Sequence, residues 1–192
     1  YDDYLRELWL ILEGELIGDV VTEGWLHYGF QNKNPKSDFR KGGLISLLNM
    51  LDFARENQEV VHEMCEPEHE FLFAVSSINV TYFLLKYYHL AEGLKFSRDK
   101  KELCSRKALK SFCGMLEYDS GILSKIHGML LVDLFQIWKH MKSGNSKITL
   151  LDFPKAMKYL QKKYKKVTEK HYFDNFGSLE RAYLEFKGSI KI

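Results

Sequence analysis

Proline and cysteine are scarce in this sequence, and neither sign of charge prevails. The 192 residues include 3 prolines and 3 cysteines, and the formal net charge is +2. The cysteines lack the number and spacing of a disulfide framework, so we expect reduced thiols in a cytoplasmic protein. Without a strong basic field or a recognition motif, nucleic acid is not an expected partner.

Long hydrophobic runs are absent as well. The longest segment without a charged residue runs from Phe71 to Leu85, and Ser76, Ser77 and Asn79 interrupt it. This segment is too short and too polar to span a membrane. We therefore interpret it as part of a buried helix.

Helical periodicity dominates what is present. Hydrophobic residues make up 45% of the chain and aromatic residues 14%, enough to build a packed core. Apolar residues recur at helical spacing, which predicts an all-α fold without a substantial β-sheet. We expect a single compact multi-helix domain over residues 1–192. Its helices are expected at about residues 1–20, 44–51, 71–90, 100–116, 121–142, 154–166 and 178–187.

Local signals define the start of the helix that follows residue 150. Thr149 and Asp152 have the spacing of a capping box, and Pro154 falls in the first turn, where its missing N–H costs little. In the preceding helix, Asp133 lies among apolar neighbours. We interpret this carboxylate as a hydrogen-bonded structural group.

One segment, WLHYGFQNKNPKSDFRKGGL at residues 25–44, is unlike the rest of the chain. Its aromatic residues surround a proline, a glycine pair and one arginine, Arg40. Pro35 predicts a turn because its ring fixes φ and its preceding neighbour avoids helix. Asp38 is placed to cap a helix that starts near Arg40, and Gly42 and Gly43 would let another backbone approach closely.

Arg40 has two interpretations. An arginine that serves another protein's active site needs exposure, a fixed backbone and no local group that neutralises it. Gln31 and Asp38 could orient such a guanidinium by hydrogen bonds. The alternative is a structural corner, in which Arg40 pairs with Asp38 or caps a helix end. Spacing alone favours this alternative, since a single arginine is a weak signal.

The pattern W-x3-GFQ-x3-P-x2-DFR-x2-G, from Trp25 to Gly43, resembles the signature of the ELMO domain of engulfment and cell-motility proteins and their ELMO-domain-containing relatives. The segments GGLISLLNMLDFA, FLFAVSSINVTYFLL, LFQIWKHMK and LLDFPKAMKYL resemble the same family in the same order. The likeness covers about residues 25–160, between an N-terminal helix at 1–20 and a helical extension at 167–192. It also implies an all-helical fold.

The resemblance implies one of two functions. In ELMO-domain-containing proteins, the domain is a GTPase activator for Arf-family GTPases, particularly Arf-like ones, and the motif arginine, here Arg40, is essential. The partner then binds GTP and magnesium. In the scaffold branch, which binds DOCK proteins to activate Rac, that arginine is absent and hydrolysis is not stimulated. The presence of Arg40 favours the activator function. We then expect a cytoplasmic protein that also acts peripherally at membranes.

The resemblance also assigns roles to other residues of the motif. The sequence departs from the family pattern at Lys41, where a glycine often follows the arginine, and at Asn32, where a glycine commonly stands. Lys41 places a bulky side chain beside Arg40. Five further residues are expected to contact the GTPase or to organise the motif: Trp25, Gln31, Pro35, Asp38 and Gly43.

Other candidate sites are weaker. His62, Cys65 and His69 lie close in the sequence, but their helical spacing is broken and no cysteine pair follows, so we expect no metal. Cys104 and Cys113 fall on one predicted helix, too far apart to bridge, and are interpreted as small core residues. No glycine-rich phosphate loop of the Walker type occurs, so we expect no bound nucleotide and no other cofactor.

The segment KAMKYLQKKYKKVTEK, residues 155–170, carries seven lysines and one glutamate. Met157, Leu160, Tyr164 and Val167 keep an apolar stripe, so the lysines form a basic helix face. That face is either a solvated surface or a site that docks on an anionic membrane. The membrane interpretation uses Lys155, Lys158, Lys162, Lys163 and Lys166.

Overall fold

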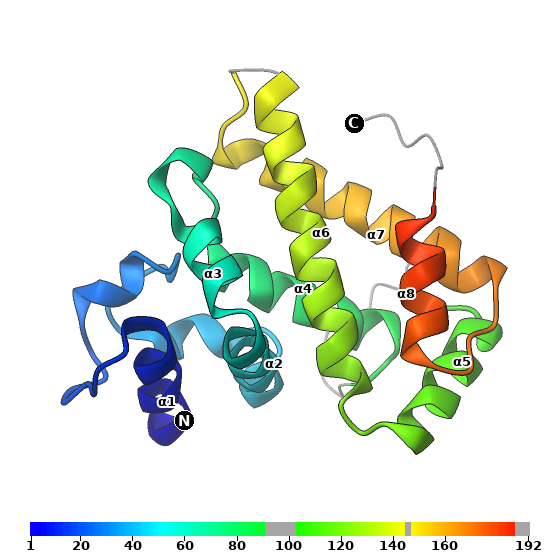
Figure 1. The fold of residues 1–192 in the computed structure, drawn as a ribbon, viewed down its shortest axis with the longest axis horizontal. Coiled ribbons are helices and arrows are strands. Elements are labelled where there is room, and N and C mark those ends of the chain that lie inside the picture. The colour runs from blue at the N-terminus through cyan, green and yellow to red at the C-terminus, as the bar shows by residue number, and fades with distance from the viewer. Residues whose placement is uncertain (91–102, 145–146, 187–192) are drawn as a thin grey trace. The chain divides into compact units, whose positions relative to one another are not determined.

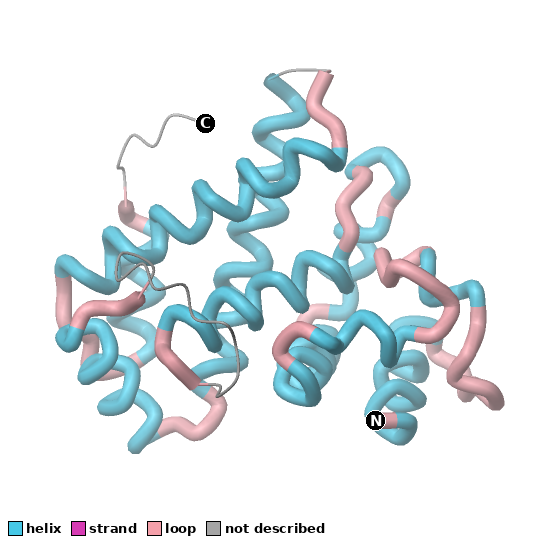
Figure 2. The backbone as a smooth tube through the Cα atoms, turned by 180° about the vertical axis from the view of Figure 1, so that it is seen from behind, coloured by secondary structure: helices cyan, strands magenta, loops and turns pink. Residues whose placement is uncertain are grey.

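The computed structural model describes residues 1–90, 103–144 and 147–186 (Figure 1). These residues form helices and loops without a β-strand, which confirms the predicted all-α fold (Figure 2). They fall into two compact units, residues 1–82 and 83–192, and the expected single domain stays a prediction. None of the described helices has the length and apolarity that a membrane crossing requires.

The first unit is built around three helices and the start of a fourth. Helices α1 (Asp2–Glu13), α2 (Gly43–Glu56) and α3 (Gln58–Cys65) pack against one another, and α4 (Phe73–Tyr87) begins in this unit. Short 3-10 helices occupy the connections: η1 (Glu23–Leu26), η2 (Pro35–Arg40) and η3 (Pro67–His69).

Helix α1 is shorter than the expected 1–20. It ends at Gly14, which takes the left-handed conformation (φ 74°) while its N–H bonds to the carbonyl of Leu10 at 2.9 Å. Glycine adopts this conformation without a steric cost, so it terminates helices readily. Leu16, which falls within the predicted range 1–20, lies beyond this end and is 82% exposed.

The start of α2 also differs from the prediction. We expected a helix from near Arg40 with Asp38 as its cap. Instead η2 ends at Arg40, and α2 begins at Gly43 with Gly42 as its N-cap at φ 82°. The left-handed glycine redirects the chain between the two helices, and the Asp38 carboxylate bonds elsewhere.

The second unit holds the remaining helices. Helix α7 (Phe153–Lys170), preceded by η5 (Leu150–Asp152), packs against α5 (Arg106–Tyr118), α6 (Ile122–Gly144) and α8 (Phe176–Leu184). Its buried Tyr164 shares a hydrogen bond of 2.6 Å with Tyr88. Burial raises the pKa of both phenols, so they stay neutral and pair as hydroxyls.

Cys104 and Cys113 are not the core residues that we expected. Helix α5 begins at Arg106, so Cys104 lies in the preceding loop and is only partly buried. Cys113 is on the helix but exposed, because it lies off the face that buries Phe112 and Met115. The predicted helix start at residue 100 lies outside the described residues, as does Lys187, the predicted end of the last helix.

The signals at α7 and Asp133 are confirmed. Thr149 and Asp152 form the predicted capping box, and Pro154 stands in the first turn of a helix that extends past the expected end to Lys170. The Asp133 carboxylate accepts hydrogen bonds from Lys163 (3.0 Å) and from the Tyr183 hydroxyl (2.6 Å). It therefore joins α6 to α7 and α8 as a structural group.

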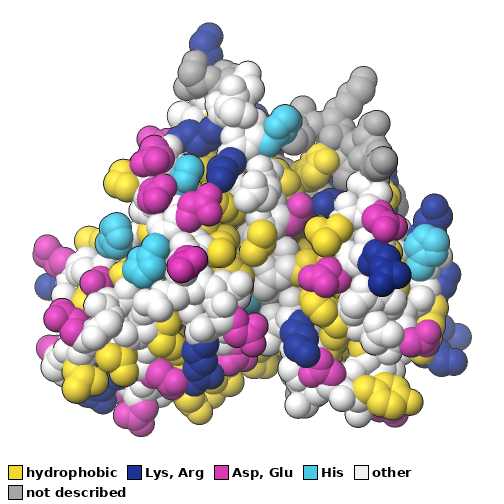
Figure 3. All heavy atoms as spheres, in the orientation of Figure 1, with side chains coloured by type: hydrophobic (Ala, Val, Ile, Leu, Met, Phe, Trp, Pro, Cys, Tyr) yellow, Lys and Arg dark blue, Asp and Glu magenta, His cyan; other side chains and the backbone are white. Residues whose placement is uncertain are grey.

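Charges of both signs share the surface. On the face drawn in Figure 3, basic and acidic side chains are interspersed, in keeping with the net charge of +2. Among these side chains of opposite charge, Arg55 and Glu7 form an ion pair that joins α2 to α1.

Gly29 should tolerate alanine worse than any exposed glycine does. Its φ is 78°, and a Cβ atom would lie 2.7 Å from the Leu72 Cα. We expect Gly29→Ala to lower the free energy of unfolding by about 2 kcal/mol or more, measured by urea denaturation. Gly14→Ala is the matched control, since it has φ 74° and open space, and should cost about 1 kcal/mol. Equal losses would contradict the close backbone approach at Gly29.

Candidate functional site

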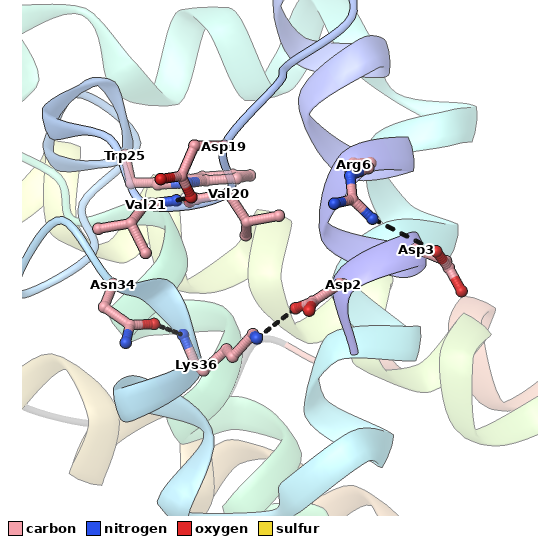
Figure 4. Close-up of polar contacts among 9 residues, drawn as sticks. All are labelled: Asp2, Asp3, Arg6, Asp19, Val20, Val21, Trp25, Asn34 and Lys36. Carbon is pink, nitrogen blue, oxygen red and sulfur yellow. Dashed lines mark hydrogen bonds and ion pairs between the residues drawn. The ribbon is translucent and has the colours of Figure 1, made fainter.

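The segment between α1 and α2 presents Arg40, and we call residues 22–42 the arginine loop. Its base is aromatic. The Trp25 ring is fully buried, donates from Nε1 to the Val20 carbonyl at 2.7 Å, and lies edge-on to Trp9 and Phe30, at centroid distances of 4.9 and 5.2 Å (Figure 4). Phe39 extends the cluster from Phe30. Trp25 thus organises the loop from beneath.

Two glycines allow backbones and rings to approach the arginine loop closely. A Cβ on Gly24 would lie 2.5 Å from the Trp9 ring, and one on Gly29 would overlap the backbone at Leu72. Beside Gly29, the Tyr28 carbonyl accepts from the Ala74 N–H at 2.9 Å. These contacts attach the loop to α1 on one side and to the start of α4 on the other.

The Asp38 carboxylate closes the arginine loop. It is only 9% exposed and accepts from the Gln31 N–H at 2.7 Å and from the Ser37 hydroxyl at 3.2 Å. Pro35, also buried, opens η2, and the Asn34 side chain accepts from the Lys36 N–H at 3.3 Å (Figure 4). Every residue of η2 is thereby held in place.

Arg40 is the exposed end of this arrangement. Its Nε donates to the Ser37 carbonyl at 2.8 Å. Among the residues that the structure describes, its two Nη groups meet no hydrogen-bond acceptor, and no carboxylate pairs with it. The alternative in which Arg40 pairs with Asp38 is therefore wrong. The alternative in which Arg40 caps a helix end holds in part, since its Nε alone bonds to a carbonyl of η2, that of Ser37.

We expected that Gln31 and Asp38 could orient the guanidinium by hydrogen bonds, and neither forms one to it. Gln31 donates its backbone N–H to Asp38, and it is exposed and lines the pocket beside Arg40. Asp38 acts on Arg40 only through Ser37, whose hydroxyl it binds and whose carbonyl holds Nε.

A shallow pocket of about 280 Å³ lies beside Arg40. The arginine loop supplies one wall, and α4 supplies the other through Val75, Ile78 and Asn79. Lys41 borders the pocket and lies over the Tyr82 ring, with Nζ 5.6 Å from the ring centre. Sequence patterns gave no sign of the α4 wall, because its residues have the spacing of a buried helix.

Helix α1 supports the loop through polar contacts as well. Lys36 forms an ion pair with Asp2, and this hydrogen bond lowers the pKa of the Asp2 carboxyl (Figure 4). The Tyr28 hydroxyl donates to Glu13 at 2.9 Å, and burial together with this carboxylate raises the Tyr28 pKa above its ordinary value. The N-terminal helix is therefore part of the site's framework.

The predicted weakness of the metal candidates has a structural reason. Burial raises the pKa of the Cys65 thiol to about 12, which disfavours the thiolate that a metal needs. Among the described residues, the group with ligand atoms close enough together is Glu66, Glu68 and His69, on and beside η3, and its two glutamates are exposed. Such acidic groups are common on surfaces.

The basic face of α7 loses one of its five predicted members. Lys155, Lys158, Lys162 and Lys166 are exposed. Lys163 is not on this face: its side chain is 13% exposed, it pairs with Asp133, and it lies 4.1 Å from the centre of the Tyr183 ring. Its place in the predicted membrane site was wrong, because its ammonium group contacts Asp133 on α6 and Tyr183 on α8.

These features define an all-helical module whose arginine loop presents Arg40 without an acidic partner among the described residues. Comparison with known proteins agrees. The model of the ELMO/CED-12 family matches residues 1–157, and the chain belongs to this family. The matched residues include α1, which contacts the arginine loop. No solved structure matches the chain.

Individual relatives are distant. The chain is 22% identical to ELMO domain-containing protein C of Dictyostelium discoideum over 88% of this chain and 26% of that protein. It is 30% identical to human ELMO domain-containing protein 2 over 50% of this chain and 34% of the relative. The chain thus spans about a quarter to a third of the length of these curated relatives.

Replacing Asp38 by asparagine should loosen the arginine loop. The change removes the charge that strengthens the bonds from Gln31 and Ser37, so we expect unfolding to become easier by about 1–2 kcal/mol in urea titrations. Ser37→Ala is the control, since it keeps the carbonyl that holds Arg40 and should cost less than Asp38→Asn. A larger loss from Ser37→Ala would refute the central role of the carboxylate.

Proposed function

We propose that this chain activates GTP hydrolysis by a small GTPase of the Arf or Arf-like family, with Arg40 as the residue that acts on the partner. The observation that carries the proposal is the state of Arg40. Its guanidinium is exposed, unpaired among the described residues and oriented by a single bond at Nε. The resemblance of the surrounding motif to that of the ELMO-domain-containing GTPase activators supplies the class of partner.

The geometry of Arg40 suits this chemistry. GTP hydrolysis develops charge on the oxygens of the transferred phosphoryl group, and an arginine supplied by a second protein stabilises that charge. With Nε occupied by Ser37, the two Nη groups remain to meet two phosphate oxygens at once. Such an arginine accelerates hydrolysis by about 10³- to 10⁵-fold, or roughly 4 to 7 kcal/mol of barrier.

A held side chain also reduces the entropic cost of the encounter. The Asp38–Ser37–Arg40 contacts fix the backbone and the first part of the side chain before a partner arrives. Less rotamer freedom is then lost on binding. Trp25, Pro35, Asp38 and Gly43 organise the loop in this proposal, while Gln31 and Lys41 lie at the surface where a GTPase would make contact.

We further propose a cytoplasmic protein that works partly at membrane surfaces, where GTPases of this class act. The alternative to activation is a non-catalytic module that binds a DOCK protein or another signalling partner. Arg40, which has no acidic partner among the described residues, favours activation, because a guanidinium held beside a pocket suits the charge of a transferred phosphoryl group.

Arg40→Ala should abolish stimulation of the partner GTPase. We expect the wild-type chain to accelerate single-turnover GTP hydrolysis by at least one member of a panel of Arf, Arf-like and Rho-family GTPases, and Arg40→Ala to lose about 10³-fold of that acceleration. Arg40→Lys should lose most of it too, since lysine lacks the planar fork that binds two oxygens.

Arg6→Ala is the matched control. Arg6 is exposed on α1 and pairs only with Asp3, at 3.5 Å, so its removal should leave both stability and stimulation intact. Full stimulation by folded Arg40→Lys would exclude the proposed role of the guanidinium. Absence of stimulation across the panel by folded wild-type protein would favour the interaction module.

A further inference from the structure

Four exposed lysines lie along one line of α7. Lys155, Lys158, Lys162 and Lys166 follow at intervals of three and four residues, which places them on one face of the helix. The opposite face is buried against α5, α6 and α8 and includes Leu160 and Tyr164 in the core. Figure 2 shows α7 in front of α6, seen from behind.

Three of these lysines have no acidic partner among the described residues. Lys155 pairs with Asp152 at 2.7 Å, but Lys158, Lys162 and Lys166 form no ion pair there. This contrasts with the mixed charges elsewhere, where Lys36, Lys125 and Arg55 each pair with a carboxylate. The line therefore keeps a net positive charge, with Asp152 and Glu169 as the carboxylates at its two ends.

An exposed leucine extends the same line at its N-terminal end. Leu151 precedes Lys155 by four residues and is 90% exposed, and its neighbour Leu150 is 45% exposed. The capping box holds the turn that carries them, through the bond from the Thr149 N–H to Asp152 at 3.1 Å. A leucine so exposed on a fixed turn makes no contribution to the core, and it places an apolar side chain beside the lysines.

We propose that Leu151 and the four lysines, here called the α7 stripe, dock this protein on a bilayer that contains anionic lipids. Leu151 and Leu150 enter the interfacial region, and the ammonium groups lie among the acidic headgroups. The pattern of apolar residues followed by a row of cations is that of interfacial helices. The stripe is about 22 Å long at the rise of an α-helix, so a flat surface can meet all of it.

Charge and chemistry favour a bilayer over the other occupants of a basic surface. In α7, Phe153 and Tyr159 are partly buried and Tyr164 is buried, so the helix offers no fully exposed ring on which bases could stack, as a nucleic-acid site would. An acidic protein would account for the lysines, whereas the leucine at the end requires an apolar phase beside the negative charge. The α7 stripe does not depend on Arg40, and the proposal stands whether or not the chain activates a GTPase.

Vesicle sedimentation tests the α7 stripe. We expect the full chain to bind vesicles of phosphatidylcholine with phosphatidylserine, and to bind phosphatidylcholine alone far more weakly. The double variant Lys158→Gln/Lys162→Gln should reduce partitioning onto the anionic vesicles by about 25-fold, or fivefold for each lysine. Leu151→Ser should reduce it by about fivefold through loss of apolar insertion.

The matched control is Lys33→Gln/Lys110→Gln, which removes the same net charge from exposed positions outside α7. Its partitioning should stay within about twofold of the wild type, because only lysines near the bilayer contribute. All of these side chains are exposed, and circular dichroism will verify that the variants fold. Equal losses in the control and in the α7 double variant would overturn the proposal. So would equal binding, or no binding, to the two kinds of vesicle.

Discussion

The buried carboxylate of Asp38 is the constraint on which the arginine site depends. It joins the two ends of the turn by accepting from the Gln31 N–H, and it binds the Ser37 hydroxyl. Ser37 in turn holds the Arg40 Nε through its carbonyl. A charged acceptor makes these bonds stronger than neutral ones and costly to break once buried. The aromatic base around Trp25 supports this closure, but it does not by itself determine where Arg40 lies.

The cations of this protein fall into two groups that differ in their partners. Lys163 and Arg55 meet carboxylates and join helices within their own units. Arg40 and Lys158 are exposed and have no acidic partner among the described residues. A cation without a partner adds little to stability, whereas it remains available to an anionic ligand. Both surfaces for which we propose functions contain cations of this second group.

Membership of the ELMO/CED-12 family agrees with the position of α1. The recognisable motifs begin at Trp25, yet the family match also covers α1. In the structure, Trp9 of α1 contacts Trp25, and a Cβ on Gly24 would overlap the Trp9 ring. A helix without a motif of its own is thus part of the framework that presents the arginine.

Much of the local structure could be predicted from the sequence. The all-α fold, the capping box before α7 and the structural role of Asp133 follow from spacing and residue type, because they depend on periodicity, on backbone groups a few residues away and on burial among apolar neighbours. Asp38 was also singled out correctly as a residue of the motif. Its partner was not, because the choice between capping a helix and closing a loop depends on the path of the chain.

What only the tertiary structure decided are the contacts between segments far apart in the sequence. The separation of Lys163 from the other lysines depends on Asp133, thirty positions earlier, and on Tyr183. The α4 wall beside Arg40 depends on how the loop packs at Gly29. Sequence by itself determined the all-helical class of the fold and which residue is the candidate for action on a partner. The fold alone determined that Arg40 has no acidic partner among the described residues, because pairing is a matter of distances that no local pattern encodes.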